Sequence, residues 1–180
     1  MKLVVWLWNP WEKYKSNRHN IWAAMLEEFL DWEKLWELKY DNKWKSEILV
    51  SDDFDDRVIF CFPQTFMNLS WEAVWPLSKF YKIKPEDILV LHDEIDFVVW
   101  RIAFKKWWSA ACHNGLKNII EKLWSKDFNR IRIGVGRPAT SNMVTDYVLS
   151  KFKPDEKKLL KEKYDEVSDF IFGFLKNNGW

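Results

Sequence analysis

The sequence has little cysteine and no long hydrophobic run, and each shortage excludes a class of protein. Two cysteines in 180 residues, Cys61 and Cys112, are too few for a disulfide framework and fit a reducing compartment. No run of eighteen apolar residues occurs, so no transmembrane helix is expected. Residues 1–5 lead into a strand pattern without the hydrophobic region of a signal peptide. We therefore expect a cytoplasmic protein that does not contact a membrane.

Glycine is also scarce, whereas tryptophan is abundant. The chain has 5 Gly and 14 Trp, although glycine ordinarily makes up roughly 7% of residues. Aromatic side chains can form stacking platforms for bases. A Trp-rich module on a membrane surface would instead need Trp grouped with Lys or Arg on one amphipathic face. The tryptophans here fall mostly at expected turns and strand ends, which argues against the membrane interpretation.

The net charge of +1 averages two segments of opposite character. Residues 27–56 contain eleven acidic side chains and four lysines, whereas residues 101–137 contain nine basic and two acidic side chains. A basic segment of this kind can bind phosphates by releasing their counterions. The alternative is a solvated surface that the acidic segment balances, and charge alone leaves both interpretations open.

Apolar patterns predict strands that alternate with helices. Strands are expected at 3–5, 45–50, 57–62, 88–91, 98–104 and 130–135, and helices at 20–35, 65–81, 113–123 and 154–175. Thr65 can cap the second helix, which Pro76 must kink or restart. No linker or internal repeat divides the chain. This order predicts one α/β domain over residues 1–180, with a largely covered sheet.

Polar side chains follow the expected strands at their carboxyl ends, where functional residues of α/β sheets gather. Asn9 follows the first strand, Asp93 follows the buried strand 88–91, and His19 precedes the first helix. A lone histidine is more often an exposed or hydrogen-bonded imidazole than a catalytic one. A carboxylate such as Asp93, however, would fix the tautomer of His19 and raise its basicity. Asn114 follows His113 at an expected helix N-terminus, where free backbone N–H groups favour an anion.

A histidine that activates water directly is the simplest chemistry for these residues. No serine or cysteine lies in a nucleophile-elbow context, so a covalent mechanism is less favoured. Neutral donors for a developing oxyanion would come from three asparagines, Asn9, Asn68 and Asn114. A metal site on residues 92–94 is weak, because adjacent side chains of a strand point to opposite faces.

Five segments, in this order along the chain, resemble the signatures of the bacterial-type peptidyl-tRNA hydrolase family. They are 9–20 (NPWEKYKSNRHN), 63–70 (PQTFMNLS), 92–96 (HDEID), 113–117 (HNGLK) and 130–138 (RIRIGVGRP). The resemblance implies hydrolysis of the ester between a peptide and the 3′ end of a tRNA, which returns free tRNA to translation. It also implies a mixed, mostly parallel twisted sheet covered by helices, a monomer, and no metal or other cofactor.

The resemblance further implies a role for each matching residue. His19 matches the general base, Asp93 the residue that holds it in its basic form, and Asn9 the residue that discriminates blocked from free aminoacyl-tRNA. Substrate-contacting positions are matched by Tyr14, Phe66, Met67, Asn68 and Asn114. Lys105 and Arg132 match basic residues that meet tRNA phosphates, and both lie in the basic segment. A non-catalytic RNA-binding protein on the same scaffold is the alternative, but it would not need the His19 and Asp93 pair.

Tryptophan stands where the family characteristically has glycine. The positions are Trp6, Trp8, Trp11, Trp22, Trp71, Trp100, Trp107, Trp108 and Trp124. Indole in place of glycine risks backbone strain or overpacking at each site, which argues against an array of stacking platforms. We hypothesise that UGA codons, which mean glycine in the source lineage, have been translated as tryptophan. Restoring all 14 would give 19 glycines, an ordinary content. Cys112, before the HNG motif, also departs from a family glycine, and this hypothesis does not explain it.

Overall fold

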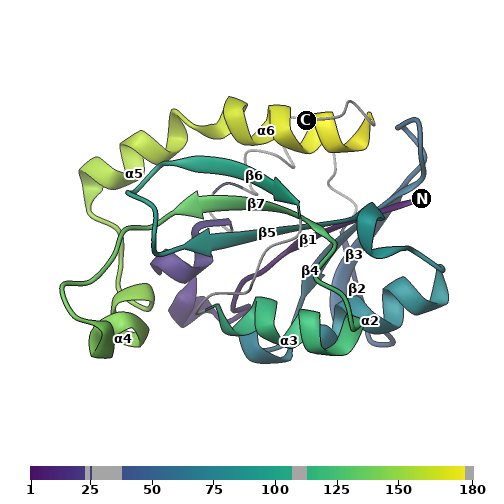
Figure 1. The fold of residues 1–180 in the computed structure, drawn as a ribbon, viewed down its shortest axis with the longest axis horizontal. Coiled ribbons are helices and arrows are strands. Elements are labelled where there is room, and N and C mark those ends of the chain that lie inside the picture. Colours follow the sequence, from purple (N-terminus) through teal and green to yellow (C-terminus); the bar gives the residue numbers. More distant parts are fainter. Residues whose placement is uncertain (23–24, 26–37, 107–112, 177–180) are drawn as a thin grey trace.

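A seven-stranded sheet lies between two layers of helices in the computed structural model, which describes residues 1–22, 25, 38–106 and 113–176 (Figure 1). The strands are β1 (Lys2–Trp6), β2 (Lys39–Asp41), β3 (Ser46–Ser51), β4 (Val58–Pro63), β5 (Ile88–Glu94), β6 (Ile102–Lys106) and β7 (Asn129–Gly134). Their spatial order is β2-β3-β4-β1-β5-β7-β6. The four central strands β4, β1, β5 and β7 are parallel, and β3, β2 and β6 add antiparallel pairs at the edges. The expected α/β fold with a mixed sheet is confirmed.

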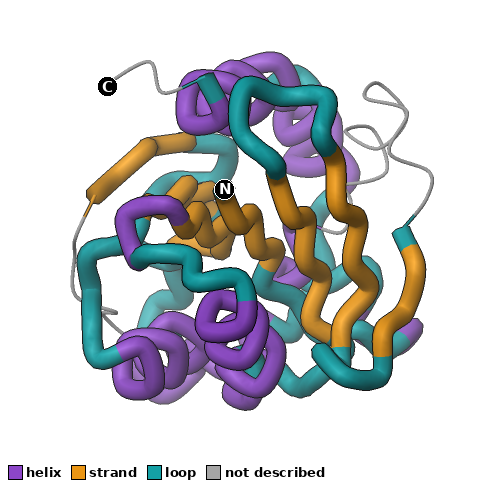
Figure 2. Tube along the Cα trace, turned by 90° about the vertical axis from the view of Figure 1, so that its right-hand side faces the viewer, coloured by secondary structure: helices purple, strands orange, loops and turns teal. Residues whose placement is uncertain are grey.

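Helices cover both faces of this sheet. The described α-helices are α2 (Trp71–Phe80), α3 (Asn114–Leu123), α4 (Val144–Val148), α5 (Pro154–Lys161) and α6 (Tyr164–Leu175). Figure 1 shows α5 and α6 above the sheet, α2 and α3 below it, and α4 beyond one end of the strands. In Figure 2 the same two helical layers lie at the top and bottom, with the sheet between them. Among the described helices, none combines the length and the apolar character needed to cross a membrane.

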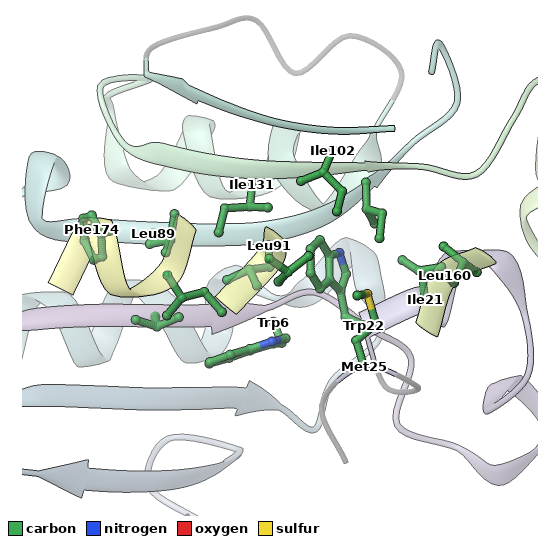
Figure 3. Close-up of a cluster of buried hydrophobic side chains, with 14 of the residues drawn as sticks. Trp6, Ile21, Trp22, Met25, Leu89, Leu91, Ile102, Ile131, Leu160 and Phe174 are labelled. Atoms are coloured by element: carbon green, nitrogen blue, oxygen red, sulfur yellow. The ribbon is translucent and has the colours of Figure 1, made fainter. Parts of the chain in front are cut away.

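The strands are apolar on both faces because each face packs against helices. In β1, Val4 and Trp6 enter the core beneath α5 and α6, whereas Leu3 and Val5 enter the core above α2 and α3. Figure 3 shows the first of these cores, where Leu89 lies near Phe174 of α6. Burial on both faces explains why these segments are continuous apolar runs and do not alternate with polar residues.

The strands expected at 3–5, 45–50, 57–62, 88–91 and 130–135 are confirmed to within a few residues. The helix expected from Thr65 was wrong at its start. Residues Met67–Leu69 form a 3₁₀ turn, and α2 begins at Trp71 and continues through Pro76. No helix can run through residue 66, because Phe66 has an extended backbone with φ −61° and ψ 149°. The Met67 N–H that follows it bonds to Asn9 Oδ1 at 3.2 Å.

Three further boundaries differ from expectation. The strand expected at 98–104 starts at Ile102, because Trp100 has a φ of 69° and the backbone turns before it. The long C-terminal helix divides into α5 and α6. Of the helix expected at 20–35, residues 21, 22 and 25 are helical, and the remainder beyond 22 lies outside the described residues. β2 and α4 had no counterpart among the expected elements, since both are short.

Substituting Leu89 by alanine tests the contribution of the α6-side core. Leu89 is fully buried on the central strand β5. The loss of its side-chain contacts and the cavity left behind should lower the free energy of unfolding by about 2–5 kcal/mol. Urea denaturation measures this change. Val98→Ala, at a side chain that is 66% exposed, is the control and should change stability by less than about 0.5 kcal/mol. Equal effects of the two substitutions would contradict this account of the core.

Candidate active site

A pocket of about 340 Å³ opens near the carboxyl ends of β1 and β5, beside the N-terminus of α3. Eight residues that the sequence analysis selected line it: Asn9, Tyr14, His19, Phe66, Met67, Asn68, Asp93 and Asn114. The wall also includes residues that the sequence analysis did not select: Glu94, Ile95, His113, Val144, Thr145, Val148 and Leu149. The structure therefore brings together side chains that are up to 105 positions apart in the predicted set, from Asn9 to Asn114.

The predicted pair of His19 and Asp93 is in direct contact. Nδ1 of His19 lies 2.6 Å from Oδ1 of Asp93. An ionised carboxylate can only accept hydrogen bonds, so Nδ1 carries the proton and donates it. Nε2 of His19 is then the basic nitrogen. Asp93 is 3% exposed and His19 lies at the pocket wall, so the pair joins a buried carboxylate to an imidazole that substrate can reach.

A second imidazole, His113, donates to the same carboxylate oxygen. Its Nε2 lies 3.0 Å from Asp93 Oδ1, and its Nδ1 accepts the backbone N–H of Leu116 at 3.3 Å. The second contact fixes Nε2 as the protonated nitrogen. It also makes His113 the N-cap of α3. From the sequence, the anion-binding role in the His113-Asn114 motif falls to Asn114. A histidine at the first residue of the expected helix 113–123 was the signal for the capping role, because α3 itself begins one residue later.

The 3₁₀ turn Arg18–Asn20 holds His19 through contacts on either side of it. Arg18 binds segments near the C-terminus, including Glu156. Asn20 is 1% exposed. Its Oδ1 accepts the backbone N–H of Asn9 at 2.8 Å, and its Nδ2 donates to the Asn9 carbonyl at 2.7 Å. The turn is thus attached at each of its three residues: Arg18 to Glu156, His19 to Asp93 on β5, and Asn20 to Asn9.

Asn9 is positioned by its backbone and its side chain together. Oδ1 of Asn9 accepts the N–H of Met67 at 3.2 Å. This contact determines which end of the amide is oxygen, so the amide nitrogen is the group that Asn9 can offer as a donor to a ligand. The same bond connects the end of β1 to the 66–69 turn, which contributes Phe66, Met67 and Asn68 to the pocket.

The pKa values of His19, Asp93 and His92 are shifted by burial and by neighbouring charges. Burial by itself lowers the pKa of His19, but the charge of Asp93 and the hydrogen bond to it outweigh burial and leave the pKa above its ordinary value. Burial raises the pKa of Asp93, whereas the charges and hydrogen bonds of His19 and His113 hold it well below its ordinary range. Asp93 therefore stays ionised. Burial and the neighbouring His113 lower the pKa of His92, which is neutral and not part of this pair.

The two residues expected to meet tRNA phosphates, Lys105 and Arg132, do not line this pocket. Arg132 on β7 donates from Nε and Nη2 to Oε2 of Glu94, at 3.0 and 2.7 Å, and its side chain is 12% exposed. Lys105 on β6 is half-buried and lies opposite Arg130, which is itself buried. Part of the basic segment is therefore inside the protein, and residues 107–112 lie outside the described residues.

The arrangement fits activation of water better than metal binding. His19, Asp93 and His113 offer ligand atoms within 4.8 Å of one another, a set of a kind that zinc accepts. However, Asp93 Oδ1 is already the acceptor of two N–H donors, so a metal ion would have to displace both protons. With those protons in place, the site is a base whose imidazolium form a buried carboxylate stabilises.

The protein is a single α/β domain with an open pocket, and a histidine at the pocket wall is paired with a buried carboxylate. This combination is typical of a hydrolase. The peptidyl-tRNA hydrolase family profile matches residues 3–179. Peptidyl-tRNA hydrolase of Mycoplasma capricolum is 40% identical over 98% of this chain and 94% of its own length. That of Bdellovibrio bacteriovorus is 44% identical over 95% of this chain and 87% of its own length. The chain belongs to the peptidyl-tRNA hydrolase family.

A solved structure supports the same assignment. The crystal structure of peptidyl-tRNA hydrolase from Acinetobacter baumannii superimposes with a TM-score of 0.91 at 32% sequence identity, and the match covers 99% of this chain and 90% of that one. The sequence resemblance to this family is thereby confirmed, and the chain is an enzyme of the hydrolase class.

Removing the charge of Asp93 should lower the pKa of His19. In Asp93→Asn the burial of His19 persists while the attraction that offsets it is lost, so more of the imidazole is neutral at any given pH. Titration of the imidazole by NMR measures the change, and His19→Gln identifies the signal among the three histidines. Among the described residues, two titratable side chains contact the His19 imidazole: Asp93 at 2.6 Å, and His113, whose ring centroid lies 5.1 Å from that of His19. An unchanged pKa in Asp93→Asn would contradict the assigned pairing.

Proposed function

We propose that the chain hydrolyses the ester between a peptide, or an N-blocked amino acid, and the 3′ end of tRNA, with His19 as general base. The observation that carries this proposal is the 2.6 Å contact between His19 and the buried Asp93 at the wall of an open pocket. Nε2 of His19 takes a proton from a water molecule while the oxygen of that water attacks the ester carbonyl. The imidazolium then returns a proton to the departing ribose oxygen, so base and acid are one residue.

Neutral amides would bind the acyl group and stabilise the oxyanion. Asn9, Asn68 and Asn114 line the pocket, and an amide N–H stabilises developing negative charge without making the resting site cationic. Asn9 would also discriminate blocked from free aminoacyl-tRNA, because the nitrogen of its amide is the end that it can present to the acyl group. Asp93 and His113 keep the base in one tautomer through both steps.

The aromatic and apolar side chains at the pocket edge would bind the end of the substrate. Tyr14, Phe66 and Met67 line the pocket, and Phe66 is 49% exposed with its ring centroid 4.0 Å from that of Trp11. Exposed rings of this kind stack on bases or pack on apolar side chains. The substrate-contacting roles of Asn68 and Asn114 complete this set.

The basic edge of the sheet would approach the tRNA backbone. Lys105 and Arg132 lie on the neighbouring strands β6 and β7. Glu94 neutralises Arg132 in the free protein, so a phosphate would have to share or displace that carboxylate. This arrangement gives Arg132 a smaller net contribution to binding than the sequence alone suggested. A monomeric enzyme that acts in the cytoplasm stays a prediction.

A non-catalytic RNA-binding protein on the same scaffold is the alternative function. It requires the basic segment but not the pocket. Two histidines donate hydrogen bonds to one buried carboxylate beside that pocket. Burying this charge costs free energy of folding, and binding of RNA alone does not require it. This observation favours the enzyme.

Loss of the imidazole tests the general base. His19→Ala should reduce kcat on N-acyl-aminoacyl-tRNA by roughly 10²–10⁴-fold, the usual contribution of a positioned base. In the parent protein, kcat/KM should fall as the pH falls through the pKa of His19, because only the neutral imidazole accepts a proton and that pKa is raised. Arg57→Lys is the control and should leave kcat unchanged, because Arg57 forms an exposed ion pair with Asp52 and neither residue lines the pocket. Undiminished hydrolysis by His19→Ala would exclude the proposed mechanism.

We also propose that the tryptophans at family glycine positions are UGA codons that the source lineage reads as glycine. The backbone supports this proposal at two of them. Trp100 has a φ of 69° and Trp124 a φ of 54°, in the left-handed region that favours glycine. Trp124 ends α3 in this conformation, the usual place for a C-terminal glycine, and its side chain is 93% exposed. In addition, Nε1 of Trp22 is buried without a hydrogen-bond partner among the described residues.

Glycine at position 124 should stabilise the protein. Trp124→Gly removes the strain of a left-handed Cβ-bearing residue and should raise the free energy of unfolding by about 1 kcal/mol. Chemical denaturation measures this change. Trp75→Gly, in the interior of α2, is the opposite control and should cost about 1 kcal/mol. Sequencing the gene gives the direct test, since UGG codons at positions 100 and 124 would refute the codon proposal whatever the stability change.

A further inference from the structure

The residue before the base, Arg18, is a buried cation with an acceptor for each part of its guanidinium. It is 4% exposed. Nη2 donates to both carboxylate oxygens of Glu156, at 3.0 and 2.7 Å, and Nη1 donates to the carbonyl of Val135 at 2.9 Å. Nε lies 3.4 Å from Oγ of Ser150. These partners lie 117 to 138 positions away along the chain, so the contacts join the first 20 residues to the C-terminal part of the chain.

The backbone and two rings complete the enclosure of Arg18. Its own N–H bonds to the Ser150 carbonyl at 2.9 Å. The guanidinium carbon lies 4.6 Å from the ring centroid of Tyr147 and 4.9 Å from that of Phe152. A planar fork with fixed donor directions suits this site, whereas the single ammonium of lysine cannot reach Glu156, Val135 and Ser150 together.

Glu156 is itself fixed, which makes it a rigid anchor for Arg18. One of its oxygens accepts the backbone N–H of Lys153, the N-cap residue of α5, at 2.7 Å. Its side chain is 14% exposed. The turn that carries His19 is therefore connected, through one ion pair, to the N-terminus of a helix that packs on the sheet.

Net stability is a poor explanation for this pair. Removing two charges from water costs free energy that a buried ion pair often barely regains, and apolar residues of similar volume often serve stability as well or better. The enclosed side chain of Arg18 instead fixes the position of the backbone in the Arg18–Asn20 turn. The next residue is His19, whose contact with Asp93 depends on where the turn lies.

We infer that Arg18 is a positioning residue for the hydrolytic reaction: its ion pair with Glu156 holds the Arg18–Asn20 turn so that His19 stays in contact with Asp93. This inference rests on the proposed role of His19 as the base. Arg18 does not line the pocket and acts through its neighbour. A misplacement of the base by even about 1 Å is enough to lower a rate by up to roughly 10²-fold.

Two substitutions that preserve charge separate geometry from electrostatics. Arg18→Lys keeps the cation but loses the fork, and Glu156→Asp keeps the anion but withdraws it by one methylene. We expect each to lower kcat on N-acyl-aminoacyl-tRNA by roughly tenfold or more, with KM changed less than kcat. We also expect each to lower the pKa of His19 in NMR titrations, because the contact with Asp93 loosens. The double variant should be little worse than the single ones, since both break one interaction.

Matched controls exclude a merely structural effect. Arg57→Lys also replaces a guanidinium that donates two hydrogen bonds to a carboxylate, here the exposed Asp52, and should leave kcat and the pKa of His19 unchanged. Leu89→Ala lowers stability without touching the turn, and at a temperature where it is folded it should also leave that pKa unchanged. If Arg18→Lys does not fold, Glu156→Asp still tests the inference.

The outcomes distinguish this inference from the proposal beneath it. If His19→Ala retains hydrolysis, the role of His19 as base is refuted, and the role of Arg18 falls with it. If His19→Ala is inactive but Arg18→Lys and Glu156→Asp fold with normal kcat and an unchanged pKa of His19, the inference about Arg18 alone is overturned. A lowered pKa together with a lowered kcat in either charge-preserving variant supports it.

Discussion

One carboxylate oxygen organises this active site. Asp93 Oδ1, at the end of the central strand β5, accepts hydrogen bonds from His19 and from His113. Burial alone would favour a neutral acid, and the two imidazole donors reverse that preference and keep Asp93 ionised. The same two bonds fix both tautomers. The basicity of His19 depends on this buried charge, and His113 connects the charge to the start of α3.

Asp93 and the two histidines that bind it are each held in place by a different part of the fold. β5 lies between two parallel strands in the middle of the sheet, so Asp93 has little freedom to move. His113 is fixed by capping α3. His19 lies in a short 3₁₀ turn, which the side chains of its flanking residues, Arg18 and Asn20, attach to the rest of the fold. The site is rigid on one side by sheet structure and on the other by hydrogen bonds.

The basic segment illustrates why charge counts from sequence overstate a binding surface. Nine basic residues lie between 101 and 137, but Arg130 is buried and its pKa is lowered to about 10 by burial and by Arg132. Arg132 is paired with Glu94. The positive potential offered to a nucleic acid backbone therefore comes from fewer side chains than the sequence contains, with Arg101 and Lys106 exposed at the same edge.

The sequence by itself determined five of the seven strands, the two-sided core and about half of the pocket lining. Continuous apolar runs marked β1 and β5 because parallel strands are buried on both faces. Asn9 and Asp93 marked the site because they lie at the carboxyl ends of those strands, and His19 marked it because a carboxylate was available to it. Tertiary structure decided what local patterns do not encode. The 66–69 turn is hydrogen-bonded to Asn9, and Arg132 pairs with Glu94 on a neighbouring strand. Arg18 and His113 acquire their roles from partners 20 to 138 positions away. Periodicity reports which face of an element is buried, whereas hydrogen-bond partners are set by how the finished layers meet.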